Sequence, residues 1–135
     1  MYHLVSLSVS TPDKESIVEI TAQVEAVIRD SGVEHGLCTV FTPHTTCGVT
    51  LNEHADPAVS RDLLYALNLI VPREGAYAHQ EGNSPAHVKA SLIGSSQSIP
   101  ICNSRLCLGR WQGIFLCEFD GPRQRTFLVE ICGER

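Results

Sequence analysis

The chain has 135 residues, a length typical of one domain that can bury its own core. Hydrophobic residues make up 43% of it and charged residues 19%, which excludes a disordered or fibrous protein. The net charge of −5 argues against nucleic acid as a partner, because that binding depends on clustered Lys and Arg. The first residues do not resemble a signal peptide, and no apolar run approaches the ~20 residues of a membrane span. We therefore expect a cytoplasmic protein with no membrane partner.

In chain order, the N-terminal half predicts a strand, a helix and two further strands. Alternating polarity predicts a strand over residues 3–9. Thr11-Pro12 is typical of a helix start, and helically spaced apolar residues continue to a stop at Gly32. Residues 36–42 and 47–51 are strand-like and flank the segment PHTT.

The second half predicts two more helices and then several strands. Asp56-Pro57 marks the start of a second helix, and a polar loop over 72–82 leads to a short third helix. Ser84 is its predicted N-cap, and Gly94 is its end. Four β-type runs follow, over residues 98–102, 105–108, 111–119 and 125–132. The pattern indicates a single α+β domain over residues 1–135 with a sheet core and two or three helices.

Three histidines are candidate metal ligands. His87 is expected in the first turn of the third helix, where the helix dipole keeps its imidazole neutral, as a metal ligand must be. His79 lies in the loop before that helix, and His44 follows a proline at a strand exit. Together they predict a three-histidine site with an open position. Their spacing matches no compact ligand motif, so isolated loop histidines are the alternative.

Two acidic positions are candidates for chemistry or for pairing. Glu53, at the end of a strand after Asn52, is either a general base or a solvated carboxylate. Glu118 and Gln112 lie in an otherwise apolar strand, where an unpaired buried charge is costly. Glu118 should therefore meet an arginine across the Asp-Gly-Pro turn, at Arg123 or Arg125. Alternatively, these two arginines bind a phosphate with their planar guanidinium groups.

Other patterns limit the class of enzyme. The chain contains no phosphate-binding P-loop, no dinucleotide fingerprint and no hydrolase nucleophile elbow. Its six cysteines form no C-x-x-C pair, and most lie in apolar runs, so we interpret them as reduced, buried thiols.

Three segments carry a resemblance to a known family. PHTTCGVTLNEHADPAVSRDLL, HQEGNSPAHVKASLIG and GRWQGIFLCEFDGPRQRTFLVEI resemble the YjbQ family, whose members are also named secondary thiamine-phosphate synthase enzymes. The resemblance implies a β-sandwich-like core, a homotrimer and a metal held by His44, His79 and His87. It also places the family's Asn-Glu and Asp-Gly-Pro-Arg stretches on residues 52–53 and 120–123. Cys47 departs from the family, where alanine is more usual, and puts a thiol near His44.

The resemblance implies an enzyme that joins a hydroxymethylpyrimidine diphosphate to a thiazole phosphate. Three imidazoles favour zinc or another transition metal over magnesium, which prefers oxygen ligands. That preference favours one alternative, a metal-dependent hydrolase of a small phosphorylated metabolite with Glu53 as base. A second alternative is a non-enzymatic module that binds a metal or phosphorylated ligand. The residues assigned to the site are Glu53, Asp120 and Arg123 for catalysis, and Asn52, Asn83, Gln112 and Arg125 for binding the phosphorylated substrate.

Overall fold

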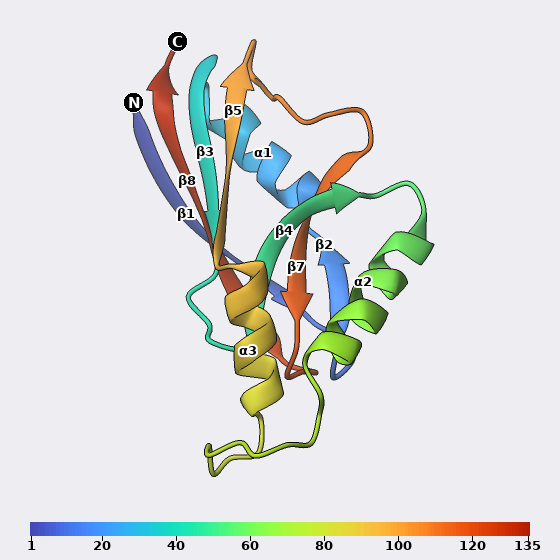
Figure 1. The fold of residues 1–135 in the computed structure, drawn as a ribbon. Coiled ribbons are helices and arrows are strands. Elements are labelled where there is room, and N and C mark those ends of the chain that lie inside the picture. Colours follow the sequence, from blue (N-terminus) through green and yellow to red (C-terminus); the bar gives the residue numbers. More distant parts are fainter.

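The computed structural model describes residues 1–135 as eight strands and three helices. The helices are α1 (Thr21–Ser31), α2 (Pro57–Ile70) and α3 (Ser84–Ile93). The strands are β1 (Tyr2–Ser10), β2 (Ser16–Glu19), β3 (His35–Phe41), β4 (Cys47–Glu53), β5 (Ser96–Cys102), β6 (Arg105–Leu106), β7 (Gln112–Glu118) and β8 (Gln124–Glu134). Figure 1 shows the helices on the flanks of the strands, which confirms the α+β class with three helices.

The strands form two antiparallel sheets around a shared core. The larger sheet has the order β1-β8-β3-β5-β6, and the smaller has the order β2-β7-β4. Val129 and Val40 from the larger sheet, Leu116 from the smaller one, and Val24 and Ile28 from α1 belong to one buried cluster. This arrangement confirms the sandwich-like core, because apolar side chains of two sheets and one helix exclude water together.

The first helix begins later than the sequence predicts. Residues 16–19 form β2, which pairs with β7 at Ile17 and Cys117, and α1 begins only at Thr21. Thr11 does not cap a helix, because its hydroxyl donates to Glu118 and accepts from the Arg123 N–H. The tertiary partners of this segment therefore override a local helix-start pattern.

The later helix starts follow the sequence more closely. Asp56 caps α2 as predicted, since its side chain accepts from the Ala58 N–H at 2.9 Å. At α3 the N-cap is Asn83 rather than Ser84, so Ser84 is the first helical residue. His87 consequently lies one position further into the helix, and its N–H already bonds to the Asn83 carbonyl.

The outer face of the larger sheet is exposed, although its inner face is buried. Tyr2, Leu4 and Leu37 all lie on the outer face and are 58%, 54% and 46% exposed. Residues on the inner face of the same sheet, such as Val40 and Ile131, are fully buried. None of the three helices is both long enough and apolar enough to cross a bilayer.

Candidate functional site

A polar cleft of about 330 Å³ collects most of the predicted site residues. None of its ten lining residues is hydrophobic; they are His44, Thr45, Thr46, His79, Glu81, Asn83, His87, Asp120, Arg123 and Arg125. They come from the β3–β4 connection, the segment before and within α3, and the β7–β8 turn with the start of β8. We call this space the histidine cleft.

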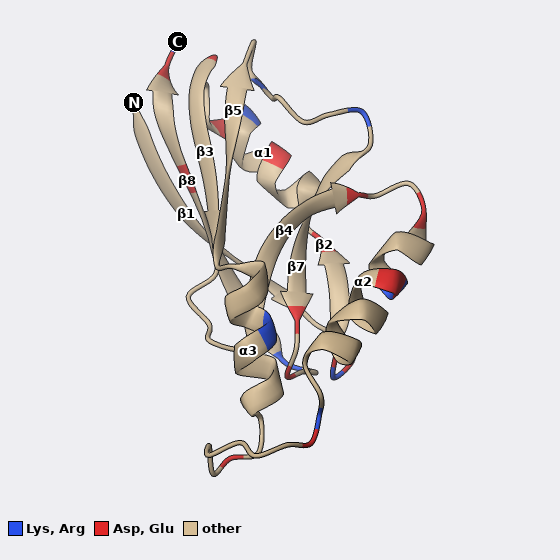
Figure 2. Ribbon diagram, in the orientation of Figure 1, with Lys and Arg blue, Asp and Glu red and all other residues tan.

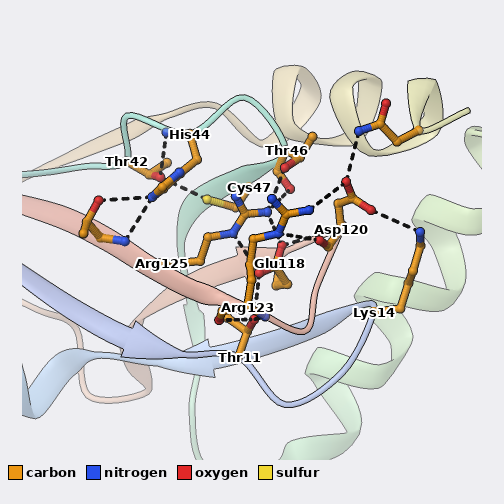
Figure 3. Close-up of polar contacts among 12 residues, drawn as sticks. Thr11, Lys14, Thr42, His44, Thr46, Cys47, Glu118, Asp120, Arg123 and Arg125 are labelled. Carbon is orange, nitrogen blue, oxygen red and sulfur yellow. Dashed lines mark hydrogen bonds and ion pairs between the residues drawn. The ribbon is translucent and has the colours of Figure 1, made fainter. Parts of the chain in front are cut away.

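A buried ion pair forms the floor beside this cleft. Arg125 Nε donates to Glu118 Oε1 at 2.8 Å, and Arg125 Nη2 contacts the second carboxylate oxygen and Thr46 Oγ1 (Figure 3). The two side chains are 2% and 0% exposed. Burial alone would raise the pKa of Glu118, but hydrogen bonds from Arg125 and Thr11 bring it below its ordinary value. This confirms the predicted pairing of Glu118 across the turn.

The pairing limits how Arg125 could bind a phosphate. Its Nε and Nη2 atoms are occupied by Glu118 and Thr46, so its guanidinium is not an open two-pronged group for phosphate. Only Nη1 makes no hydrogen bond within the chain.

Arg123 is the accessible arginine of the cleft. Its Nε donates to the Asp120 carbonyl at 2.9 Å, and its Nη2 lies 3.2 Å from Asp120 Oδ2. The Arg123 side chain is 50% exposed, whereas that of Asp120 is 15% exposed. The turn therefore leaves Arg123 half-exposed at the cleft while Asp120 holds it in place (Figure 3).

Asp120 is an ionised positioning group in this arrangement. Burial would raise the pKa of its carboxyl, but hydrogen bonds from Asn83 and Lys14 bring that pKa below its ordinary value. Asn83 Nδ2 donates to Asp120 Oδ2 at 3.0 Å, and Lys14 Nζ donates to Oδ1 at 3.1 Å. A carboxylate with three cationic or amide donors is a poor proton carrier, so we reassign Asp120 from catalysis to the orientation of Arg123.

His44 is held as a neutral imidazole with a defined tautomer. The Thr126 backbone N–H donates to His44 Nε2 at 3.0 Å, so Nε2 is an acceptor and the proton of the neutral ring lies on Nδ1. Burial and the charge of Arg125 lower the pKa of His44. The pairing of β3 with β8 ends at Leu128, and beyond that point His44 bonds to Thr126, whose strand partner on β1 is Ser8.

His79 and His87 form a pair whose separation suits a shared metal ion. Their ring centres lie 5.1 Å apart with an angle of 86° between the ring planes. Two imidazoles on one tetrahedral zinc have centres about 5 Å apart, given Zn–N bonds of about 2.0–2.1 Å. The ring separation is the one that a shared zinc ion would give, and imidazole nitrogen is a ligand of zinc and similar metals.

The third predicted ligand does not complete a metal site in this arrangement. His44 lines the same cleft, but its Nε2 is bonded to Thr126. No group of three or more His, Cys, Asp or Glu side chains is arranged to hold a metal ion. The structure thus brings the three histidines to one cleft and pairs two of them at a metal-compatible distance.

Three predicted residues lie away from the histidine cleft. β4 starts at Cys47 beside the cleft and ends at Glu53, which pairs with Gln112 on β7. Seven extended residues span about 20 Å, so Asn52, Glu53 and Gln112 lie at the opposite end of these strands. Within one chain Glu53 is therefore not the base for a water in the histidine cleft, and Asn52 and Gln112 do not contact a substrate there.

Some residues of this region were not predicted. Thr45, Thr46 and Glu81 line the cleft, and Lys14 holds Asp120 from the N-terminal segment. Thr46 lies in the His-Thr-Thr stretch, whereas no local pattern singles out Lys14.

The Cys47 thiol is buried against the Thr42 hydroxyl at 3.0 Å, and burial raises its pKa, so it is a core thiol and not part of the cleft lining.

Comparisons with known proteins agree with this architecture. The family model described as UPF0047 protein YjbQ-like matches residues 5–134. The chain belongs to the YjbQ family. A UPF0047 protein of Methanocaldococcus jannaschii is 44% identical over 132 residues, which cover 98% of this chain and 96% of that protein. The UPF0047 protein YugU of Bacillus subtilis is 43% identical over 96% of this chain and 99% of its own length.

Solved structures of the YjbQ family share the fold over almost the whole chain. A YjbQ/UPF0047 crystal structure from Clostridium acetobutylicum has a TM-score of 0.93 and 50% identity, covering 95% of this chain and 99% of that one. A protein of unknown function from Sulfolobus solfataricus has a TM-score of 0.96 at 34% identity, covering 99% of both chains. The names of these relatives state no activity.

Proposed function

We propose that this chain is an enzyme that acts on a small phosphorylated substrate in the histidine cleft. The reaction is the joining of a hydroxymethylpyrimidine diphosphate to a thiazole phosphate with release of pyrophosphate, a secondary thiamine-phosphate synthase activity. The observation that supports this proposal is a wholly polar cleft in which an accessible arginine faces three histidines. Such a lining suits an anion better than an apolar ligand.

The residues of the cleft have different roles in the proposed anion binding. Arg123 binds the phosphate groups, because it is half-exposed and already oriented by Asp120. Arg125 adds a fixed positive charge from the floor, with Nη1 as its free donor. Asn83 keeps Asp120 in place from the start of α3. Stabilising the charge on a departing pyrophosphate is the largest task of such a reaction, and preorganised cations perform it without rearrangement.

A divalent metal, zinc or another transition metal, is part of the proposal. His79 and His87 are the residues that would hold it, and His44 would join them only by giving up its bond with Thr126. When bound, such an ion would supply further neutralisation of negative charge on the leaving group. A homotrimer in the cytoplasm completes the proposal, and the six free cysteines suit a reducing compartment.

The test is a direct assay of purified protein, stripped of metal and then reloaded with zinc. The two thiamine precursors should yield thiamine phosphate and pyrophosphate in equal amounts. Arg123→Ala should lower the rate or the substrate affinity about ten- to a hundredfold while zinc content stays normal, since a charge-assisted hydrogen bond is lost. His87→Ala should lose zinc and should lose activity as a consequence. Arg61→Ala, at an exposed arginine of α2, is the matched control and should change neither quantity.

Two outcomes would contradict the proposed reaction. Hydrolysis of p-nitrophenyl phosphate with no joining of the precursors would indicate the hydrolase alternative. Binding of the precursors without turnover of either substrate would indicate a binding module.

A further inference from the structure

A second, larger cleft lies between α1 and the β6–β7 connection. Its volume is about 510 Å³, within the range of small-molecule sites. Gln112 and His54 line it, and both belong to the end of β4 and β7 that is far from the histidine cleft. The two clefts share no lining residue. We call it the arginine cleft.

The wall of the arginine cleft is held by hydrogen bonds from backbone N–H groups. The hairpin between β5 and β6 turns at Asn103 and Ser104, both with positive φ, and the Ser104 N–H bonds to the Glu34 carbonyl at 3.0 Å. The Gly109 N–H donates to Gln112 Oε1 at 2.8 Å, and the His54 N–H donates to the Trp111 carbonyl at 2.9 Å. Such a wall is formed before a ligand arrives, which lowers the entropic cost of binding.

Three arginines line this cleft without a carboxylate partner. Arg29 comes from α1, Arg105 from β6 and Arg110 from the β6–β7 connection. None of them takes part in an ion pair within 4.0 Å, unlike Arg73, Arg123 and Arg125 elsewhere in the chain. Arg110 is packed over the Trp111 ring at 4.9 Å from its centre, which limits its freedom.

The charge balance of this region opposes that of the whole chain. Figure 2 shows basic but no acidic segments on the β6–β7 connection, and both a basic and acidic segments on α1. Glu25 is the only acidic residue in the lining, so three arginines leave an excess of two positive charges. The net charge of the whole chain is −5. A positive pocket in an acidic protein attracts anions locally.

We infer that the arginine cleft binds a small organic phosphate. The dianionic phosphate would lie among the guanidinium groups of Arg29, Arg105 and Arg110, whose planar donors match phosphate oxygens. Ile28, Leu106 and Leu108 provide an apolar strip in the same cleft for the organic part of the ligand. Gln112, bonded to Gly109, holds the β6–β7 connection that carries Arg110. This inference does not depend on the reaction proposed for the histidine cleft.

Phenyl phosphate is a suitable probe, since it joins a dianion to an apolar ring. Titration followed by amide NMR shifts should perturb residues 104–112 and the α1 residues near Arg29 in a saturable way. Arg105→Gln and Arg29→Gln should each raise the dissociation constant of phenyl phosphate at this site about ten- to a hundredfold. Arg105→Lys keeps the charge but loses the planar donors, so it should restore only part of the affinity.

Three controls establish that the phosphate group is bound in the arginine cleft itself. Arg61→Gln should leave the affinity unchanged, and phenol, which lacks the phosphate, should not bind. Arg123→Ala should abolish shifts in the histidine cleft only. Absence of saturable shifts at residues 104–112 at millimolar phenyl phosphate would overturn the inference. Binding there that survives both arginine substitutions in folded protein, as judged by the NMR spectrum, would overturn it too.

Discussion

At the scale of single residues, the decisive feature is the buried pair of Glu118 and Arg125. A lone charge at either position would be very costly, because both side chains are almost completely excluded from water. The pair is completed by Thr11 and Thr46, which come from two other segments of the chain. It therefore joins the N-terminal segment, the β3–β4 connection and the β7–β8 hairpin under the histidine cleft.

Glu118→Gln should destabilise the fold by about 3–5 kcal/mol, because it leaves the Arg125 charge buried without its counter-ion. Urea unfolding at neutral pH measures the loss, and Asp62→Asn, at an exposed position of α2, is the control with little expected change. The native pKa of Glu118 is lowered, so its stabilising contribution is complete above the unfolded value of about 4.3. It is lost as the pH falls through the native pKa.

The same unfolding series at acidic pH checks the sign of this effect. The stability of the unmodified protein should decrease below about pH 4.3, and Glu118→Gln should show a smaller decrease over that range. Equal acid sensitivity in both proteins would mean that other carboxyl groups dominate the acid response.

At the scale of elements, β3 and β8 approach each other closely where two glycines face one another. Gly36 and Gly133 are Cα partners in the antiparallel ladder. A Cβ atom added to Gly36 would collide with the backbone of Cys132 and Gly133, and one added to Gly133 would collide with the His35 carbonyl. The two strands are therefore in close backbone contact at this pair, with no room for a side chain at either position.

Gly36→Ala should therefore destabilise the fold by about 1–3 kcal/mol, because backbone atoms must move to admit a methyl group. The matched control is Gly75→Ala, where the added Cβ would meet only the Tyr77 ring at 3.5 Å, an ordinary contact. Urea midpoints of the two variants measure the difference. If Gly36→Ala were as stable as Gly75→Ala, the two strands would be further apart than the structure describes.

At the scale of the whole molecule, two polar clefts lie at opposite ends of the β4–β7 pair, and one broad sheet face is open. Tyr2, Leu4 and Leu37 on that face form an exposed apolar area, which favours contact with another protein surface. We place the contact of the proposed homotrimer on this outer face of the larger sheet.

Light scattering should therefore give a particle of three times 14.7 kDa at micromolar concentration. Leu37→Lys, which puts a charge in the centre of the outer face, should shift the protein towards monomers. Tyr65→Lys alters an exposed, largely apolar residue on α2, away from this face, and should leave the trimer intact. A monomeric mass for the unmodified protein would rule out the trimer.

The sequence by itself determined features that depend on near neighbours and on local chemistry. The cap of α2 at Asp56, the apolar strands around residues 114–131 and the need of Glu118 for an arginine all follow from patterns within a few residues. The family resemblance over nearly the whole chain adds the fold, because three long segments match in order.

Only the tertiary structure decided which distant groups meet. Thr11 resembles a helix cap when only its local sequence is considered, but its hydroxyl is hydrogen-bonded to Glu118 and Arg123. Residues 16–19, predicted as helix, form a strand. Glu53 follows His44 closely in sequence, yet an extended strand carries it to the opposite end of the sheet. Arg105 and Arg110 are near neighbours in the sequence, whereas Arg29 lines the same cleft only because α1 packs beside β6. These outcomes depend on strand order and packing between segments far apart in the chain, which local periodicity does not encode.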